Sequence, residues 1–144
     1  MKDKILIDTN LWIYLYALNP QAKRNRIEDL VQQNFANIIV STQILWELYH
    51  VVTRKGLLTH ESARDIVIEM VATFPVSEIA TANVLEALKI QEIFHYSYWD
   101  SLVVATAVLT DCDTLYSEDM QHGQSVGGKT RIINPFLETR GTRE

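Results

Sequence analysis

The stretch ILIDTNLWIYL, residues 5–15, decides how the fold begins. Three apolar residues with strand character end at Asp8, and apolar side chains then recur at helical spacing. Asp8, Thr9 and Asn10 are all good N-cap residues, because their side chains accept hydrogen bonds from free backbone N–H groups. A capping role is therefore sufficient to explain Asp8 taken alone. A further role depends on whether other carboxylates converge on the end of this strand.

Short runs of β-forming residues alternate with helical patterns along the rest of the chain. Strands are expected at residues 4–8, 37–41, 74–79, 113–117 and 131–134, and helices at 9–17, 22–34, 42–55, 60–72, 81–95 and 98–110. Strands separated by helices of this length predict crossover units and an α/β fold, with a mainly parallel sheet of four to five strands covered on both faces. Right-handed crossovers place the carboxyl ends of the strands along one edge, where open α/β sheets bind ligands. Asp8 should point into that crevice.

Composition sets broad limits on what the protein does. A hydrophobic fraction of 47% and a charged fraction of 22% are typical of a soluble globular protein, and we expect one domain spanning residues 1–144. The single cysteine, Cys112, excludes an intrachain disulfide framework and fits a reducing cytoplasm. We expect no membrane association, because no apolar run has spanning length and MKDKILID lacks the features of a secretory signal. The net charge of −5 argues against nonspecific coating of nucleic acid, but acidic residues that hold cations can still bind phosphates.

Two further carboxylates accompany predicted helices. Glu47 lies at the margin of an apolar stripe, where a glutamate is costly unless it binds a metal or pairs with a cation such as Arg54. Asp100 stands at the start of a nearly all-apolar helix, and the run from Ser97 to Asp100 matches a capping box. Capping and metal binding are compatible, because a carboxylate has two oxygens.

The segment LYSEDMQHG, residues 115–123, carries the last candidates. A predicted strand ends there in Ser-Glu-Asp, so Glu118 or Asp119 lies at its carboxyl end. Acidic residues are common in turns after strands, so this observation is weak by itself. The full set of candidates is Asp8, Glu47, Asp100 and Asp119, with Glu118 as a competitor for the last place.

A cluster of ionised carboxylates repels itself unless divalent cations hold it together. Oxygen ligands select hard ions, Mg²⁺ or Mn²⁺, and the scattered histidines have no zinc spacing. The sequence also has no Gly-rich phosphate loop and no G-x-S-x-G nucleophile elbow. Hard ions held by carboxylates suit phosphodiester hydrolysis, because they lower the pKa of water and stabilise the charge that develops on the phosphate.

These motifs together resemble a known family. ILIDTN, the isolated glutamate, YWDSLVVATA, LYSEDMQHG and INPF resemble the PIN-domain ribonucleases, and more narrowly the VapC-type toxins of toxin–antitoxin pairs. The resemblance covers nearly the whole chain and implies a three-layer α/β/α sandwich with Mg²⁺- or Mn²⁺-dependent endoribonuclease activity. It also implies a homodimer, a small antitoxin partner and an RNA substrate, with tRNA favoured.

The resemblance also implies roles for individual residues. Asp8 and Asp100 look like the primary metal ligands, and Glu47 and Asp119 complete the acidic pocket. The polar supporting positions are Asn10 and Ser117; Glu118 competes with Asp119, and His122 belongs only to the local form of the motif.

Basic and aromatic residues are weaker candidates for RNA contacts. The cluster of Lys23, Arg24 and Arg26 can contact phosphates, although a solvated helix face explains it equally well. Core packing or a protein interface is the more common use of the aromatic residues that can stack on bases, which are Trp12, Tyr14, Tyr16, Trp46, Tyr49, Tyr98 and Trp99. The helix at residues 9–17 has more large apolar residues than one core-facing stripe needs, which favours an interface there.

Two alternatives stay open at this point. One is a catalytically silent PIN-fold binding module, although such a module need not keep four carboxylates. The other is a phosphatase resembling the haloacid dehalogenases, whose pattern requires a second aspartate where this chain has Asn10.

Overall fold

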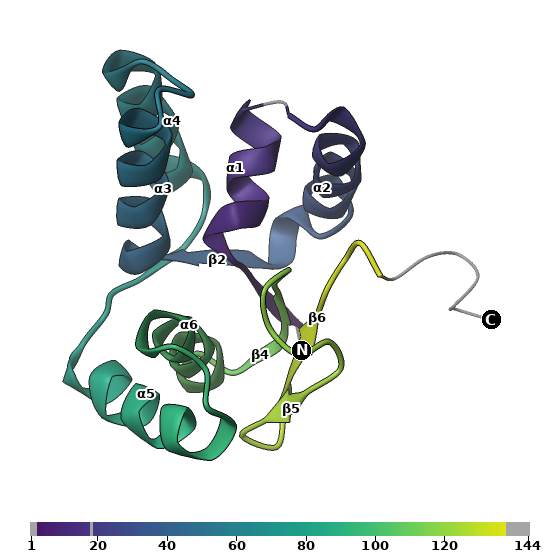
Figure 1. Cartoon of the computed structure of the whole chain (residues 1–144), viewed down its shortest axis with the longest axis vertical. Coiled ribbons are helices and arrows are strands. Elements are labelled where there is room, and N and C mark those ends of the chain that lie inside the picture. The colour runs from purple at the N-terminus through teal and green to yellow at the C-terminus, as the bar shows by residue number, and fades with distance from the viewer. Residues whose placement is uncertain (1–2, 18, 138–144) are drawn as a thin grey trace.

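The computed structural model describes residues 3–17 and 19–137 (Figure 1). The strands are β1 (Lys4–Ile7), β2 (Ile38–Ser41), β3 (Val76–Ser77), β4 (Cys112–Tyr116), β5 (Ser125–Val126) and β6 (Thr130–Ile133). The helices are α1 (Thr9–Ala17), α2 (Gln21–Gln33), α3 (Thr42–Arg54), α4 (His60–Thr73), α5 (Thr81–Phe94) and α6 (Tyr98–Leu109), with a 3-10 turn, η1 (Phe35–Asn37). Each helix predicted from the sequence is present, with ends that differ by at most one residue.

The strands form a six-stranded sheet in the order β3-β2-β1-β4-β6-β5. β1 lies in the middle and pairs in parallel with β2 and β4, while β2 pairs in parallel with β3 and β4 with β6. The prediction of a mainly parallel α/β sheet is therefore confirmed. The strand that the sequence did not indicate is β5, which pairs antiparallel with β6 and has only two residues, too few for a periodic pattern.

Helices cover both faces of this sheet, as Figure 1 shows. α5 and α6 pack together on one face, and α1 and α2 lie on the other. α3 packs against α1 and α4. In the described ranges, no helix has the length and apolar character needed to span a membrane.

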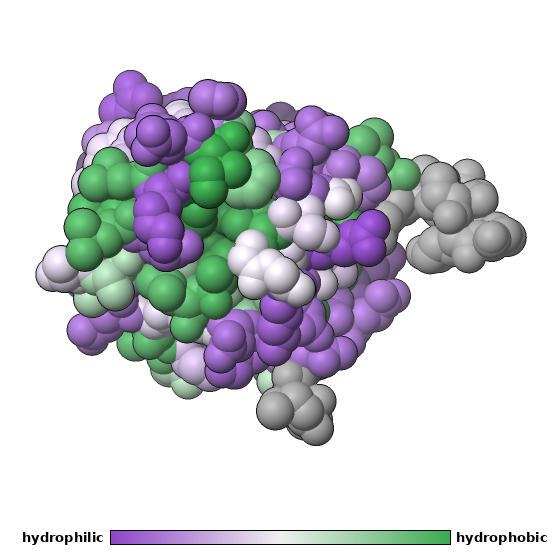
Figure 2. Space-filling model, turned by 90° about the horizontal axis from the view of Figure 1, so that it is seen from below, coloured by the Kyte–Doolittle hydropathy of each residue, from purple (hydrophilic) through white to green (hydrophobic). Residues whose placement is uncertain are grey.

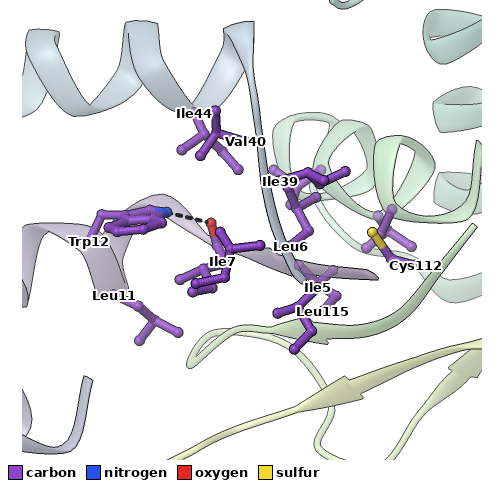
Figure 3. Packing of buried hydrophobic residues seen from close by; sticks show 14 of the residues in the cluster. Ile5, Leu6, Ile7, Leu11, Trp12, Ile39, Val40, Ile44, Cys112 and Leu115 are labelled. Atoms are coloured by element: carbon purple, nitrogen blue, oxygen red, sulfur yellow. Dashed lines mark hydrogen bonds between the residues drawn. The ribbon is translucent and has the colours of Figure 1, made fainter. Parts of the chain in front are cut away.

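The core fixes α1 on the end of the central strand. Ile5, Leu6 and Ile7 of β1 are buried, and so is Trp12 in the first turns of α1. The Trp12 indole N–H donates a 3.1 Å hydrogen bond to the carbonyl oxygen of Ile7 (Figure 3). Because this bond joins strand to helix across the intervening Asp8, the position of that carboxylate is set by the core.

The apolar residues of α1 are used inside the molecule. Leu11 and Trp12 are buried, and residues 13–17 are partly buried between α2 and α3. Intramolecular packing thus accounts for the apolar excess that favoured an interface on this helix. Exposed large apolar side chains occur instead on α5, at Leu85, Leu88 and Ile93. Figure 2 shows a hydrophobic area, in green, on the face of the molecule seen from below.

Candidate active site

A cavity of about 450 Å³ opens where β1 ends and α1, α3 and α6 meet. Its lining residues are Asp8, Thr9, Asn10, Trp46, Glu47, His50, Val51, Trp99, Asp100 and Asp119. The four carboxylates among them come from four separate parts of the chain. The structure therefore brings together Asp8, Glu47, Asp100 and Asp119, which the sequence places up to 111 residues apart (119 − 8).

Asp8 directly follows β1 and is almost completely buried, with 6% exposure. Its backbone N–H donates to the carbonyl oxygen of Tyr116 at 2.9 Å, which extends the pairing of β1 with β4 by one residue. One carboxylate oxygen accepts from the Thr9 N–H at 2.8 Å, and the other accepts from the Ser117 hydroxyl at 3.0 Å. Asp8 thus accepts a hydrogen bond from the first backbone N–H of α1, that of Thr9, and also lines the cavity.

Burial changes the acid–base behaviour of Asp8. Removal from water raises the pKa of its carboxyl from the ordinary 3.8 to about 7. The hydrogen bonds from Thr9 and Ser117 oppose this rise, and the charges of Asp100 and Glu47 add to it. Burial therefore favours the protonated form of the Asp8 carboxyl unless positive charge is supplied.

Asp100 lies in the first turn of α6 and is half-buried. Its backbone N–H donates to the Ser97 hydroxyl at 3.1 Å, so the cap predicted from the sequence is made by Ser97. Burial, followed by the charge of Asp119, raises the pKa of the Asp100 carboxyl above its ordinary value. The carboxylates of the cavity thus repel one another across the gap between α6 and the loop after β4.

Glu47 projects from α3 and is held at both oxygens. Oε1 accepts from the Thr9 hydroxyl at 2.9 Å, and Oε2 accepts from Nε2 of Gln43 at 3.2 Å. In the described part of the chain no ion pair joins Glu47 to Arg54, the cation that the sequence offered as its partner. Neutral donors that fix a carboxylate leave its charge available to a ligand.

The structure separates Asp119 from its neighbour Glu118. Oδ2 of Asp119 accepts a 2.6 Å hydrogen bond from Nδ2 of Asn10, inside the cavity. Glu118 turns the other way, where it accepts a 2.6 Å hydrogen bond from the Tyr14 hydroxyl and pairs with Lys23. Asp119 is therefore the fourth carboxylate of the cavity, and Glu118 anchors the loop outside it.

His122 and the NPF segment, residues 134–136, support the loop that follows β4. Nδ1 of His122 accepts a 2.9 Å hydrogen bond from the Asn134 N–H, and Nδ2 of Asn134 lies 3.4 Å from the carbonyl oxygen of Glu118. The Ser117 hydroxyl, which donates to Asp8, also accepts from the Asp119 N–H at 3.2 Å. His122 does not line the cavity, so its contacts are those of a loop support.

The predicted RNA-contacting cations are engaged within the protein. Lys23 lies 4.9 Å from the ring centres of both Tyr14 and Phe136, in addition to its pairing with Glu118. Arg24 forms a 3.0 Å ion pair with Glu28, and Nε of Arg26 donates to the Pro135 carbonyl oxygen at 3.1 Å. Each of these three cations therefore makes contacts within the protein. RNA binding by Lys23, Arg24 and Arg26 stays a prediction.

The cavity also contains His50 and Val51, which the sequence did not single out, and Trp46 and Trp99, which it offered only as weak candidates for stacking on bases. His50 and Val51 follow Glu47 by three and four positions, so they share its face of α3. Trp46 and Trp99 each stand directly before a carboxylate of the cavity. His50 could have been predicted to lie near Glu47, because residues three apart share one face of a helix. Nothing in the sequence showed that the two tryptophans are exposed.

The donor set fits a hard divalent cation by its chemistry. As the side chains stand, no three His, Cys, Asp or Glu groups among the described residues form a ready metal-binding group. The cavity nevertheless offers four carboxylates, and burial, with a smaller contribution from their mutual repulsion, raises the pKa of Asp8 and Asp100. A cation that drew these side chains inward would relieve this repulsion, and all-oxygen donors favour Mg²⁺ or Mn²⁺.

Comparison with solved structures gives the fold an independent test. VapBC from Salmonella typhimurium bound to DNA matches with a TM-score of 0.69 and 18% identity, over 90% of this chain and 96% of that chain. FitAcB from Neisseria gonorrhoeae matches with a TM-score of 0.68 and 18% identity, over 93% and 99%. The Mycobacterium tuberculosis toxin VapC20, described as cleaving the sarcin-ricin loop, matches with a TM-score of 0.66 and 18% identity, over 81% and 90%.

At such identities these likenesses establish the shared fold alone, and no curated protein matches this sequence. The family model described as the PIN domain matches residues 5–124, which include the four carboxylates of the cavity. The chain belongs to the PIN-domain family.

Proposed function

We propose that this protein is a Mg²⁺- or Mn²⁺-dependent endoribonuclease and the toxin of a VapBC-type toxin–antitoxin pair. The observation that carries the proposal is the meeting of Asp8, Glu47, Asp100 and Asp119 in one open cavity. Oxygen donors in this number suit a hard cation, and a hard cation suits attack of water on a phosphodiester.

The positions of the four carboxylates fit two tasks. Asp8 and Asp100, whose pKa values are raised by burial and by neighbouring acids, would hold the cation. When bound, the cation lowers the pKa of water and offsets the charge that develops on the phosphate. Glu47, fixed by Thr9 and Gln43, and Asp119, fixed by Asn10, would orient the attacking water and accept its proton.

The shape of the site and the net charge support a proposal for the substrate class. A cavity at a sheet edge admits a phosphodiester backbone but cannot read a duplex groove, and sequence-specific RNA recognition mostly targets unstacked loops. The net charge of −5 leaves little general attraction for RNA, so shape and cation bridging must select the substrate. We therefore propose cleavage at an exposed loop of structured RNA, with tRNA favoured; VapC20, which has a similar fold, is described as cleaving the sarcin-ricin loop.

The proposed partners are a small antitoxin and a second copy of this chain, acting in the cytoplasm. The matching Salmonella structure is a VapBC complex, and a matching structure from Klebsiella pneumoniae is described as a toxin–antitoxin complex. An antitoxin that places a basic side chain among the four carboxylates would block the cavity and relieve their repulsion.

Incubation of total RNA with the protein and mapping of new 5′ ends would test the activity. Cleavage should require Mg²⁺ or Mn²⁺, stop with EDTA, and disappear in the Asp8→Asn and Asp100→Asn variants. Asp65→Asn is the matched control, because Asp65 is an exposed aspartate outside the cavity. Cleavage that persists in EDTA, or in both cavity variants, would overturn the proposal.

A further inference from the structure

Two tryptophans stand exposed at the mouth of the acidic cavity. Trp46 of α3 is 61% exposed and Trp99 of α6 is 54% exposed, although tryptophan is usually well buried. Their ring centres lie 6.5 Å apart and the ring planes meet at 63°, so the indoles touch edge to face. This geometry leaves aromatic surface of both rings uncovered, unlike that of Trp12, which is buried in the core.

The indoles of Trp46 and Trp99, here called the aromatic wall, line two neighbouring hollows in the surface. The first is the acidic cavity, which both tryptophans line together with the four carboxylates. The second is an apolar groove of about 320 Å³. The groove is lined by Thr42, Gln43, Trp46, Ile79, Trp99 and Leu102. A ligand bound at the carboxylates can therefore continue across the indoles into the groove.

Gln43 ties this aromatic wall to the acidic cavity. Its Nε2 donates to the carbonyl oxygen of Trp99 and to Oε2 of Glu47, both at 3.2 Å. Gln43 is buried, so the two bonds are shielded from competing water. Trp46 and Trp99 also directly precede Glu47 and Asp100 in the sequence. The wall and the carboxylates thus keep a fixed relationship to each other.

The chemistry of this arrangement fits a nucleobase better than a protein side chain. A nucleotide carries its base beside its phosphate, and bases of single-stranded nucleic acid bind by stacking on aromatic side chains. An apolar groove that continues from a phosphate-hydrolysing cavity offers such a surface at the required place. The proposed antitoxin would also cover the groove when it blocks the cavity, but a surface that a partner covers in the complex is open to a base when the antitoxin is absent.

We propose that Trp46 and Trp99 form a nucleobase-binding subsite, which holds an unstacked base next to the phosphodiester that lies at the carboxylates. This inference rests on the proposed ribonuclease function and specifies which residues bind a base of the substrate strand. The stacking surface accepts any base, so it selects single-stranded over paired RNA.

Binding should be measured in the full-length Asp8→Asn variant, which is expected not to hydrolyse the probe. The probes are a single-stranded RNA dodecamer and an oligomer of equal length in which every base is missing. RNA should quench tryptophan fluorescence, and Trp46→Leu and Trp99→Leu should each weaken its binding by about tenfold or more. Trp46→Phe keeps an aromatic face and should recover part of the affinity. Binding of the abasic oligomer should not change in any of these variants.

Ile68→Ala is the matched control, because Ile68 is 59% exposed on α4 and lies outside both hollows. The buried Trp12 reports folding in the Trp46→Leu/Trp99→Leu variant, where RNA should cause no quenching. Unchanged RNA affinity in the leucine variants, while the wild type cleaves RNA, would overturn the subsite and leave the function standing. Leucine variants that become monomeric but bind RNA normally would assign the groove to a protein interface instead. No cleavage by the wild type and no RNA binding would contradict the ribonuclease itself.

Discussion

Nδ2 of Asn10 donates a 2.6 Å hydrogen bond to Oδ2 of Asp119, across 109 residues of sequence. The bond joins the first turn of α1 to the loop after β4, so it connects the ends of the two central strands. It also distinguishes Asp119 from Glu118, whose carboxylate is held by Tyr14 and Lys23 outside the cavity.

Asp119→Asn should therefore affect mainly cleavage, and Glu118→Gln should affect mainly stability. Loss of the Asp119 charge should lower RNA cleavage by roughly a hundredfold or more, with little change in the free energy of unfolding. Loss of the Glu118 charge should leave cleavage within a few-fold and cost up to about 1 kcal/mol of stability. Single-turnover cleavage and urea unfolding measure both quantities, and equal activity loss in the two variants would contradict this assignment.

Asn10→Ala should lower cleavage roughly 10- to 100-fold while the protein stays folded, because partners that orient metal-site carboxylates contribute at this level. The same substitution should weaken metal binding, since Asp119 then loses the donor that fixes its orientation. Isothermal titration with Mn²⁺ gives the affinity independently of cleavage. An Asn10→Ala variant with unaltered Mn²⁺ affinity and unaltered cleavage would show that this hydrogen bond has no functional role.

Asp8→Asn should stabilise the metal-free protein at neutral pH. The Asp8 pKa is raised from 3.8 to about 7 in the folded state, so folded protein binds the extra proton more tightly than unfolded protein. Protonation of Asp8 therefore makes its full contribution to the free energy of unfolding below pH 3.8, and this contribution is lost as the pH rises to about 7. Asparagine does not ionise, so the difference in unfolding free energy between variant and wild type should grow across this window. A constant difference between pH 4 and pH 8 in EDTA would contradict the shifted pKa.

Mg²⁺ should stabilise the wild-type protein at neutral pH, by about 2.7 kcal/mol when its concentration is a hundred times the Kd. The gain should disappear in the Asp8→Asn and Asp100→Asn variants and persist in Asp65→Asn. Thermal unfolding with and without Mg²⁺ measures this without reference to activity. Equal stabilisation of all four proteins would place the cation elsewhere.

Ser117→Ala should move the acidic limb of the cleavage profile to higher pH. The Ser117 hydroxyl donates to the Asp8 carboxylate and lowers its pKa, so its removal should raise the pKa further. More alkaline conditions are then needed to ionise Asp8 and bind the cation. The pH dependence of kcat/KM at fixed, subsaturating Mg²⁺ tests this, and a shift toward lower pH would reject it.

The sequence by itself determined the succession of helices and strands and the parallel sheet. Residues 5–7 are apolar in succession because the central strand is buried on both faces, and the helices have apolar periodicity and capping residues such as Ser97. These signals are local, so they can be read without knowing the fold. β5 could not be predicted from the sequence, because a two-residue strand has no apolar periodicity. Its pairing with β6 depends on the turn at residues 127–128.

Only the tertiary structure decided which side chains meet. Glu118 and Asp119 are adjacent and chemically alike, and the contacts of Tyr14, Lys23 and Asn10 determine which of them enters the cavity. The exposure of Trp46 and Trp99 likewise depends on how α3 and α6 approach each other, and not on the apolar pattern of either helix. Local sequence patterns fix backbone conformation within a few residues, whereas the direction of a side chain at a site depends on partners that are distant in the chain and adjacent only after folding.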